Sequence, residues 1–263
     1  MHKDPVGDAI AEAAPEILAG KATKPFAQMA VLAVLAGMFI GFGSIAALVA
    51  QSNMADAGAV QLLSGVAFSV GLMLVMVVGT ELFTGNTLMV LPVATGELAA
   101  GRMLGAWTVV WLGNLVGSLL LAGLFFAAGG LTDGVGEAAV SLADGKLEKS
   151  ALTVFCSGIL ANILVCLAVW MAMAAPTIPA KILVILGPVT IFVAAGLEHS
   201  IANMSILPLG WLADTSAPPN LAGAVTNLVF STLGNIAGGA ALALAITFGH
   251  GTLGKSEADR TPS

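Results

Sequence analysis

Long apolar segments without charge recur along this chain and constrain its fold more than any other feature. Only 13 of its 24 charged residues lie between Pro25 and Gly254. A soluble domain carries about 25% charged residues to cover its surface, whereas this chain has 9%, with 58% hydrophobic residues. The composition therefore predicts a multi-pass α-helical membrane protein. It excludes a soluble enzyme, a nucleic-acid-binding protein and a disordered chain.

Six segments are long and apolar enough to be predicted as transmembrane helices. They are residues 27–50, 57–80, 104–128, 152–174, 182–197 and 221–248. The second segment resumes after Glu81 as residues 82–96, and the fifth resumes after Glu198 through residue 212. Backbone that leaves a helix at membrane depth must be buried in protein or line a watery cavity. We therefore expect the two interruptions to mark a transport pathway.

The ends of the chain are more polar than its centre. Residues 1–25 are predicted to form a cytoplasmic amphipathic helix, residues 26–250 a single transmembrane channel domain, and residues 251–263 a cytoplasmic tail. With the N-terminus inside, seven Lys and Arg residues lie in cytoplasmic segments, and only Lys146 and Lys149 lie outside. Positive charge favours the cytoplasmic side, so both termini are predicted to be cytoplasmic.

The two interruptions share a sequence pattern. Residues 79–86, GTELFTGN, and 196–203, GLEHSIAN, have Gly, Glu and Asn in common at a constant offset of 117. The spans that follow repeat as GNLVG at 113–117 and GNIAG at 234–238. This pattern predicts two copies of one three-span unit, at about residues 26–130 and 150–250. Because three is odd, the second copy must enter the membrane inverted, as a 3+3 repeat with two broken helices.

Glu81, Glu198 and His199 are the only ionisable residues inside the apolar regions. An ionisable residue within a membrane is a functional candidate by default. The two glutamates, with Asn86 and Asn203, are interpreted as groups that stabilise the interrupted backbone. Proton transfer by the glutamates is the alternative.

His199 has no counterpart in the first copy, where Leu82 stands. An imidazole can donate hydrogen bonds and titrates near neutral pH. His199 is therefore predicted to interact with a small anion or its conjugate acid. The alternative is a buried neutral histidine bonded to a carbonyl group.

Chemistry beyond transport finds little support in the sequence. The three histidines stand at positions 2, 199 and 250, and no metal-ligand cluster is evident. Glu198, His199 and Ser200 are adjacent in the chain, which makes the geometry of a catalytic triad implausible. We predict no enzyme activity, no metal and no cofactor.

Five segments resemble the formate/nitrite transporter family. They are ELFTGN at 81–86, GNLVG at 113–117, ANILVCLAVW at 161–170, EHSIANM at 198–204 and GNIAGG at 234–239. The resemblance runs from about residue 5 to 248. It implies an aquaporin-like homopentamer in the bacterial cytoplasmic membrane, with one pore per protomer that passes small monovalent anions or their conjugate acids.

The resemblance also implies roles for matching positions. Thr84 would face His199 at the pore centre. The outer constriction would contain Phe68, Leu183 and Phe192. The inner constriction would contain Leu72, Leu82, Phe83 and Val165. Polar residues near the ends of the pore would be Asn162, Asn235 and Lys146, with Lys149 as the alternative vestibule lysine.

Formate or nitrite is the predicted substrate, with proton coupling as an open question. Gly85 and Asn86 depart from the most formate-like form of the loop, so hydrosulfide, acetate and lactate remain alternatives. A neutral-solute pore is a further alternative, although the chain lacks the paired Asn-Pro-Ala loops of aquaporins. In the predicted mechanism Lys146 concentrates the anion, and protonation from water or through His199 yields a neutral acid that crosses the apolar constrictions at lower cost.

Overall fold

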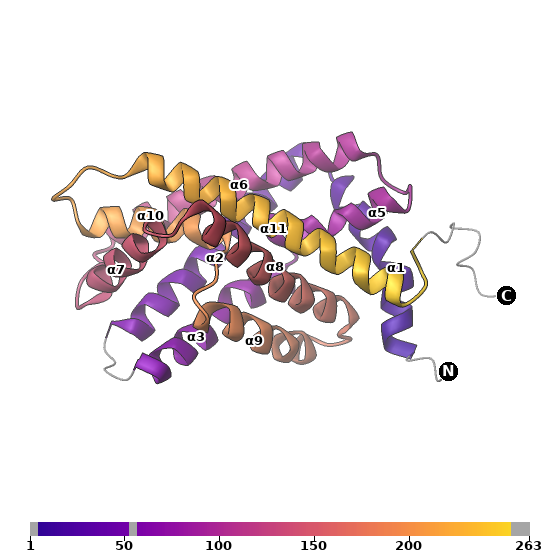
Figure 1. Cartoon of the computed structure of the whole chain (residues 1–263), viewed down its shortest axis with the longest axis horizontal. Coiled ribbons are helices and arrows are strands. Elements are labelled where there is room, and N and C mark those ends of the chain that lie inside the picture. The colour runs from indigo at the N-terminus through magenta and orange to yellow at the C-terminus, as the bar shows by residue number, and fades with distance from the viewer. Residues whose placement is uncertain (1–4, 53–56, 254–263) are drawn as a thin grey trace.

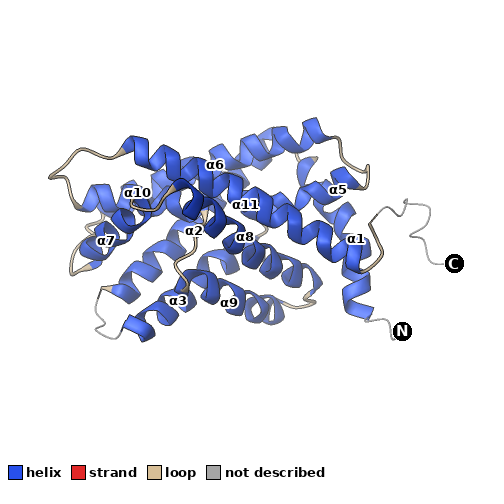
Figure 2. Ribbon diagram, viewed as in Figure 1, coloured by secondary structure: helices blue, strands red, loops and turns tan. Residues whose placement is uncertain are grey.

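The computed structural model describes residues 5–52 and 57–253, and within these ranges every regular element is a helix (Figure 2). Five helices are long and apolar enough to cross a membrane. They are α2 (Phe26–Gln51), α3 (Ala57–Val78), α6 (Ala100–Ala127), α8 (Ala151–Ala174) and α11 (Leu221–Gly249). Their bounds lie within a few residues of the predicted segments.

The remaining predicted span is α9 (Ile178–Ala194), which has 17 residues. At a rise of about 1.5 Å per residue, such a helix is slightly shorter than a bilayer core of about 30 Å. It begins four residues earlier than predicted, because the hydroxyl of Thr177 accepts a hydrogen bond from the backbone N–H of Ala180 and caps the helix. Lys181 therefore lies in the first turn of α9 rather than before it.

Shorter helices complete the fold. Two of them, α1 (Pro5–Ala22) and α7 (Val135–Leu147), lie at opposite ends of the long axis (Figure 1). The helix α7 was not predicted from the sequence. The other short elements follow the two interruptions: α4 (Phe83–Asn86), the 3-10 turn η1 (Thr87–Met89), α5 (Val90–Ala94) and α10 (Ser200–Ala213).

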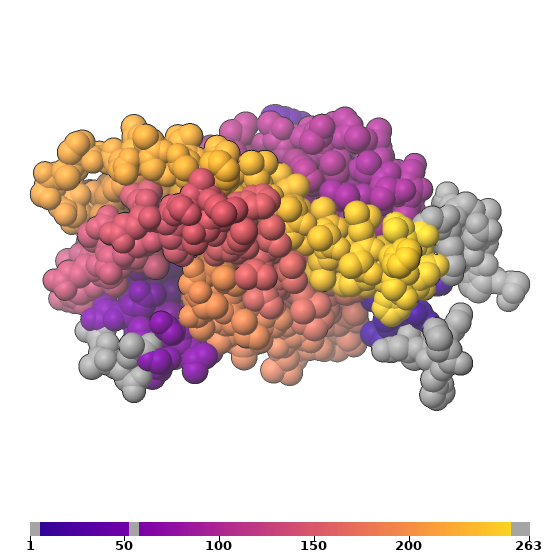
Figure 3. Space-filling model, in the orientation of Figure 1, coloured from indigo at the N-terminus to yellow at the C-terminus, as the bar shows by residue number. Residues whose placement is uncertain are grey.

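Glycines allow the long helices to approach closely. In the first half, α2 packs on α6, and a Cβ added at Gly117 would overlap the carbonyl oxygen of Val34. In the second half, α8 packs on α11, and a Cβ added at Gly234 would overlap the carbonyl oxygen of Phe155. Small residues are typical of such contacts in membranes. The helices α3 and α9 pack against each other and join the halves, while α11 runs across the visible face in gold (Figure 3).

The two ends of the described chain meet. Nδ1 of His250, just after α11, lies 2.8 Å from a carboxylate oxygen of Asp8 on α1. Both ends therefore lie on one side of the molecule, as the predicted topology requires. Residues 1–4 and 254–263, including most of the predicted tail and three of the seven cations counted for orientation, lie outside the described residues.

Candidate functional site

Each half of the chain leaves its helix at a glycine. Gly79, after α3, has a φ of +78°, and Gly196, after α9, has a φ of +62°. Side chains disfavour these angles, so glycine is the residue that ends a helix in this way. The chain then runs without helix to α4 and to α10, as the interruptions near Glu81 and Glu198 predicted.

Two buried asparagines hold the main chain at these breaks. Asn114 of α6 accepts a hydrogen bond from the N–H of Phe83 (2.9 Å) and donates to the carbonyl oxygens of Glu81 (2.9 Å) and Ala33 (2.7 Å). Buried main-chain groups need such partners. Asn114 therefore ties the first break to both α2 and α6.

Asn235 of α11 makes the equivalent contacts at the second break. It accepts from the N–H of Ser200 (2.9 Å) and donates to the carbonyl oxygens of Glu198 (3.0 Å) and Gly158 (2.9 Å). Asn235 thereby holds the start of α10, a role that the resemblance did not assign to it. The GN motif at 113–117 and 234–238 carried the signal for this pair, but the sequence did not show that the amides would reach the breaks.

The buried carboxylate of Glu81 binds two lysines rather than the main chain. Nζ of Lys24 lies 2.7 Å from one oxygen, and Nζ of Lys21 lies 3.2 Å from the other. The side-chain amide of Asn86 donates to the same second oxygen at 2.9 Å. Glu81 and Asn86 therefore bridge the break through their side chains, and their predicted direct role at the backbone belongs to Asn114.

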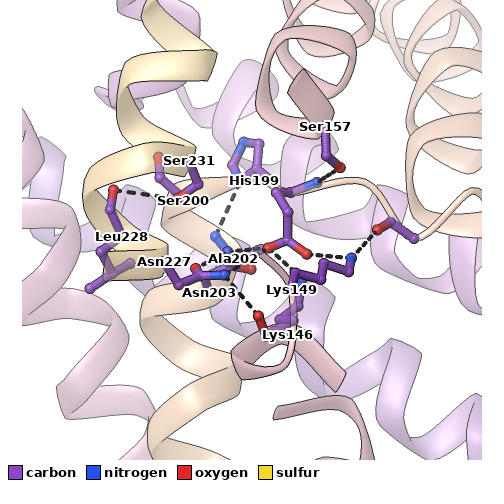
Figure 4. A network of polar contacts seen from close by, with 12 residues as sticks. Lys146, Lys149, Ser157, His199, Ser200, Ala202, Asn203, Asn227, Leu228 and Ser231 are labelled. Carbon is purple, nitrogen blue, oxygen red and sulfur yellow. Dashed lines mark hydrogen bonds and ion pairs between the residues drawn. The ribbon is translucent and has the colours of Figure 1, made fainter. Parts of the chain in front are cut away.

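Glu198 has an equivalent set of partners, the side chains of Lys146, Lys149, Asn203 and Asn227, which are labelled in Figure 4. Its oxygens lie 2.6 Å from Nζ of Lys149 and 3.2 Å from Nζ of Lys146. The amides of Asn203 (2.7 Å) and Asn227 (3.3 Å) also donate to it. Both candidate vestibule lysines therefore bind one carboxylate. Burial lowers the pKa of Lys146, Glu198 opposes that effect, and Lys149 adds to it.

The lysines of the two sets are themselves repeated in the sequence. Lys21 and Lys146, like Lys24 and Lys149, are separated by 125 residues. The predictions used Lys21 and Lys24 only in the charge count and missed their contact with Glu81. The K-x-x-K spacing before the first span of each half could have found it. In each set, two cations and one carboxylate leave a formal charge of +1.

His199 and Thr84 meet between the two halves. Nε2 of His199 lies 2.9 Å from Oγ1 of Thr84, and both side chains are buried. Nδ1 of His199 accepts a hydrogen bond from the N–H of Ala202 at 3.1 Å and so caps α10. A ring nitrogen that accepts carries no proton, so the proton of this neutral imidazole lies on Nε2 and is donated to Thr84. The hydroxyl proton of Thr84 can then be donated to a solute.

Aromatic rings lie on one side of His199. The ring of Phe192 stacks on the imidazole with centroids 5.6 Å apart, and Phe68 meets Phe192 edge-on at 5.4 Å. A cavity of about 70 Å³ lined by these rings also contacts Lys146. The cavity therefore runs from Lys146, a member of the charged set at Glu198, to the imidazole of His199. We call the part between Phe68 and Phe192 the aromatic neck.

Leu183 does not join this neck. It lies nine residues before Phe192 on α9, which places the two side chains about 180° apart on a helix of 3.6 residues per turn. Its side chain is 69% exposed, whereas Phe192 is 3% exposed. Leu183 therefore does not line this cavity, because the helix turns it to the opposite face from Phe192.

The residues predicted for the inner constriction are all buried. They are Leu72, Leu82, Phe83 and Val165. The ring of Phe83 packs edge-on against Trp107 at 5.9 Å, and Nε1 of Trp107 donates to the carbonyl oxygen of Asn86 at 2.9 Å. This contact fixes α4 against α6.

Asn162 lies beside the loop that carries Thr84. Its amide donates to Oγ1 of Thr87 (2.9 Å) and to the carbonyl oxygens of Thr84 (3.2 Å) and Asn235 (2.6 Å). Its own oxygen is buried with no hydrogen-bond partner among the described residues. Asn162 therefore links the loop that carries Thr84 to α11 and leaves one acceptor without a described partner beside Thr84.

Comparison with known proteins identifies the family of this chain. The family model for formate/nitrite transporters matches residues 8–249. The formate channel FocA of Escherichia coli (strain K12) is 36% identical over 256 residues, covering 89% of this chain and 90% of that protein. The nitrite transporter NirC of the same organism is 39% identical over 212 residues, covering 80% and 78%.

A solved structure described as a pentameric formate channel with formate bound superposes with a TM-score of 0.79 at 33% identity, covering 84% of this chain and 95% of that one. These relatives are membrane channels and transporters rather than enzymes, which confirms the predicted class and the predicted all-helical channel fold. Since the family model spans nearly the whole chain, this protein belongs to the formate/nitrite transporter family.

Proposed function

We propose that this chain forms a channel for a small monovalent anion, formate or nitrite, in the bacterial cytoplasmic membrane. The observation that carries the proposal is the arrangement around His199. Two sets of two lysines and one glutamate, each with a formal charge of +1, flank an apolar interior whose centre is the His199–Thr84 pair. Positive charge at both ends attracts an anion from either side.

The aromatic neck determines in which protonation state the solute can continue. An anion that leaves the charged set at Glu198 must lose its hydration between Phe68 and Phe192, and desolvation disfavours the charged form. Protonation of the solute, from water or by way of His199, converts it to a neutral acid that crosses the interior at lower cost. This step makes flux depend on pH.

His199 contributes in two ways. Its Nε2 proton orients the hydroxyl of Thr84, which then donates to the solute at the pore centre. Protonation of the ring would place a second proton on Nδ1 and break the bond from the N–H of Ala202. Proton relay through His199 therefore requires local opening of the first turn of α10, whereas donation from the neutral ring does not.

The assembly follows from the same relatives. The chain superposes on a pentameric channel, so we propose a homopentamer with one pore in each protomer. We also propose that the halves are inverted in the membrane with both termini cytoplasmic. Asn114 and Asn235 make equivalent contacts at the two breaks, which supports this topology. The positions of α1 and α7 at opposite ends of the molecule also support it (Figure 1).

Flux into proteoliposomes tests the proposal. We expect formate and nitrite to enter faster as external pH falls, lactate and acetate more slowly, and glycerol not at all. Lys149→Met should lower anion flux because it removes the more exposed cation of its set, whereas Lys181→Met, outside both sets, should not. Rapid glycerol entry, or anion flux that is unaffected by pH, would contradict the proposal. Native mass spectrometry checks the oligomer, and a stable trimer or tetramer would refute the pentamer.

A further inference from the structure

A surface cavity of about 420 Å³ lies where the first turns of α2 and α6 meet the end of α1. Two cations, Lys24 and Arg102, line it together with apolar and small residues. No carboxylate from the described residues is part of this lining. The cavity lies outside the His199 site, although one of its cations, Lys24, also belongs to the set at Glu81.

Both cations have hydrogen-bond donors beyond the ones that their described partners use. Nζ of Lys24 is hydrogen-bonded to a carboxylate oxygen of Glu81, and an ammonium has three donors. Nε of Arg102 donates to the carbonyl oxygen of Ala22 at 3.1 Å, which orients the guanidinium. Arg102 has no ion-pair partner among the residues that the structure describes. A guanidinium and an ammonium that line one cavity are suited to bind phosphate oxygens.

The rest of the cavity wall is apolar and open. Phe26 is 73% exposed, and Met29 and Val109 continue the wall along α2 and α6. A Cβ added at Gly101 or Gly105 would meet no heavy atom within 4 Å, so this face of α6 is empty space. An apolar chain can lie in this space beside the two cations.

Arg102 is the only charged residue in the five long apolar helices, and it stands in the first turn of α6. The first turn of a spanning helix lies at the level of lipid headgroups, and basic pockets between such helices attract anionic lipids. We propose that Lys24 and Arg102 bind the phosphate of an anionic phospholipid, with an acyl chain along Phe26, Met29 and Val109. Because Lys24 also binds Glu81, the lipid shares a cation with the first break.

Native mass spectrometry of the full chain in detergent tests this site. The probes are phosphatidylglycerol and phosphatidylcholine with identical acyl chains, each added to delipidated protein. Wild type should retain phosphatidylglycerol in preference to phosphatidylcholine, and Arg102→Gln should weaken that binding about tenfold, as expected for loss of a charge-assisted bond. Lys181→Gln is the matched control, because Lys181 also lies in the first turn of an apolar helix but does not line the cavity.

A second variant tests whether lipid binding needs the open apolar wall as well as the two positive charges. Gly105→Leu fills the open wall, keeps both cations and meets no neighbouring atom at Cβ, so the protein should fold and yet lose phosphatidylglycerol. The proposal fails if both variants retain the lipid as wild type does, or if the two lipids bind equally. It also fails if inorganic phosphate displaces the lipid at equal concentration. A change in oligomer mass in Arg102→Gln without loss of lipid would instead identify an interface between copies.

Discussion

Asn114 and Asn235 each make two hydrogen bonds to main-chain groups at a break and a third to a carbonyl oxygen of a neighbouring long helix. An asparagine amide suits this position because it accepts through its oxygen and donates twice through its nitrogen. The glutamate beside each break instead holds two lysines. At this scale the residues that look most like functional groups, Glu81 and Glu198, are electrostatic anchors for neighbouring helices.

Asn114→Ala should destabilise the protein strongly. It leaves the N–H of Phe83 and the carbonyl oxygen of Glu81 without this partner and removes the additional bond to the carbonyl oxygen of Ala33 within α2. Each buried main-chain group left unpaired costs about 1–3 kcal/mol. The melting temperature in detergent should fall by many degrees. Asn220→Ala, which removes an exposed cap of α11, should cost about 1 kcal/mol. An equal effect of the two substitutions would contradict the anchoring role.

His199→Asn should change the pH dependence of flux. An amide can replace the donor to Thr84 but cannot titrate between pH 5 and 8. If His199 carries or relays a proton, the variant should lose part of the rise in formate flux at low pH, and Thr84→Ala should alter the profile of the wild-type histidine. Flux against pH in proteoliposomes is the measurement. A variant that matches wild type in rate, anion preference and pH profile would reduce His199 to a structural cap of α10.

At the scale of the elements, the lysine sets join the short polar helices to the breaks. Lys21 and Lys24 connect the end of α1 to Glu81, and Lys146 and Lys149 connect the end of α7 to Glu198. The two sets differ in exposure: the side chain of Lys146 is 8% exposed, and that of Lys21 is 27% exposed. Screening by solvent therefore weakens the ion pairs at Glu81 more than those at Glu198.

Glu198→Gln should be more destabilising than Glu81→Gln. Removing one partner of a buried ion pair costs about 3–5 kcal/mol, and the more exposed lysines at Glu81 make its loss cheaper. Thermal unfolding in detergent measures both. Adding Lys146→Met to Glu198→Gln should restore part of the loss, because it removes the buried charge that lost its partner.

The stability of Glu198→Gln should also depend on pH in a way that differs from wild type. Burial lowers the folded-state pKa of Lys146, and the loss of Glu198 removes the effect that opposes this lowering. The unfolded chain then binds more protons than the folded one at alkaline pH, so stability must rise with pH. Glu198→Gln should therefore recover stability toward wild type as pH is raised. A stability difference that stays constant with pH would indicate that Lys146 is not the group left unpaired.

Helix packing within each half can be tested on α6 alone. Gly117→Ala forces a methyl group into the carbonyl oxygen of Val34, and such overpacking costs about 1–3 kcal/mol. Gly123→Ala adds the same group where no atom lies within 4 Å, so helix propensity should leave stability unchanged or raise it by up to about 1 kcal/mol. The melting temperature of Gly117→Ala should fall below that of wild type, and that of Gly123→Ala should stay the same or rise.

At the scale of the whole molecule, the central question is which end faces the cytoplasm. Ala99, between α5 and α6, and Ala217, between α10 and α11, are both exposed loop residues. In a Cys156→Ser background, a membrane-impermeant maleimide added to intact cells should label Ala217→Cys and spare Ala99→Cys. The reverse pattern would overturn the proposed orientation, and labelling of both at the same side would overturn the inverted repeat.

The sequence alone predicted the helical membrane fold, the position of the long helices and the two breaks. These features are local: an apolar run of sufficient length forms a helix in lipid, and Gly79 and Gly196 end their helices by backbone conformation. The repeated Gly, Glu and Asn residues also marked where the site would lie.

Only the tertiary structure decided which side chains meet. The contact of Thr84 with His199 joins residues 115 positions apart. The family resemblance implied it, but spacing along the chain could not, because it depends on how the helices of the two halves are placed against each other. The rotation of α9 turned Phe192 inward and Leu183 outward, although both are apolar residues of one helix. Spacing fixes the order of side chains along a helix, but the packing of neighbouring helices determines which face becomes the wall of the pore.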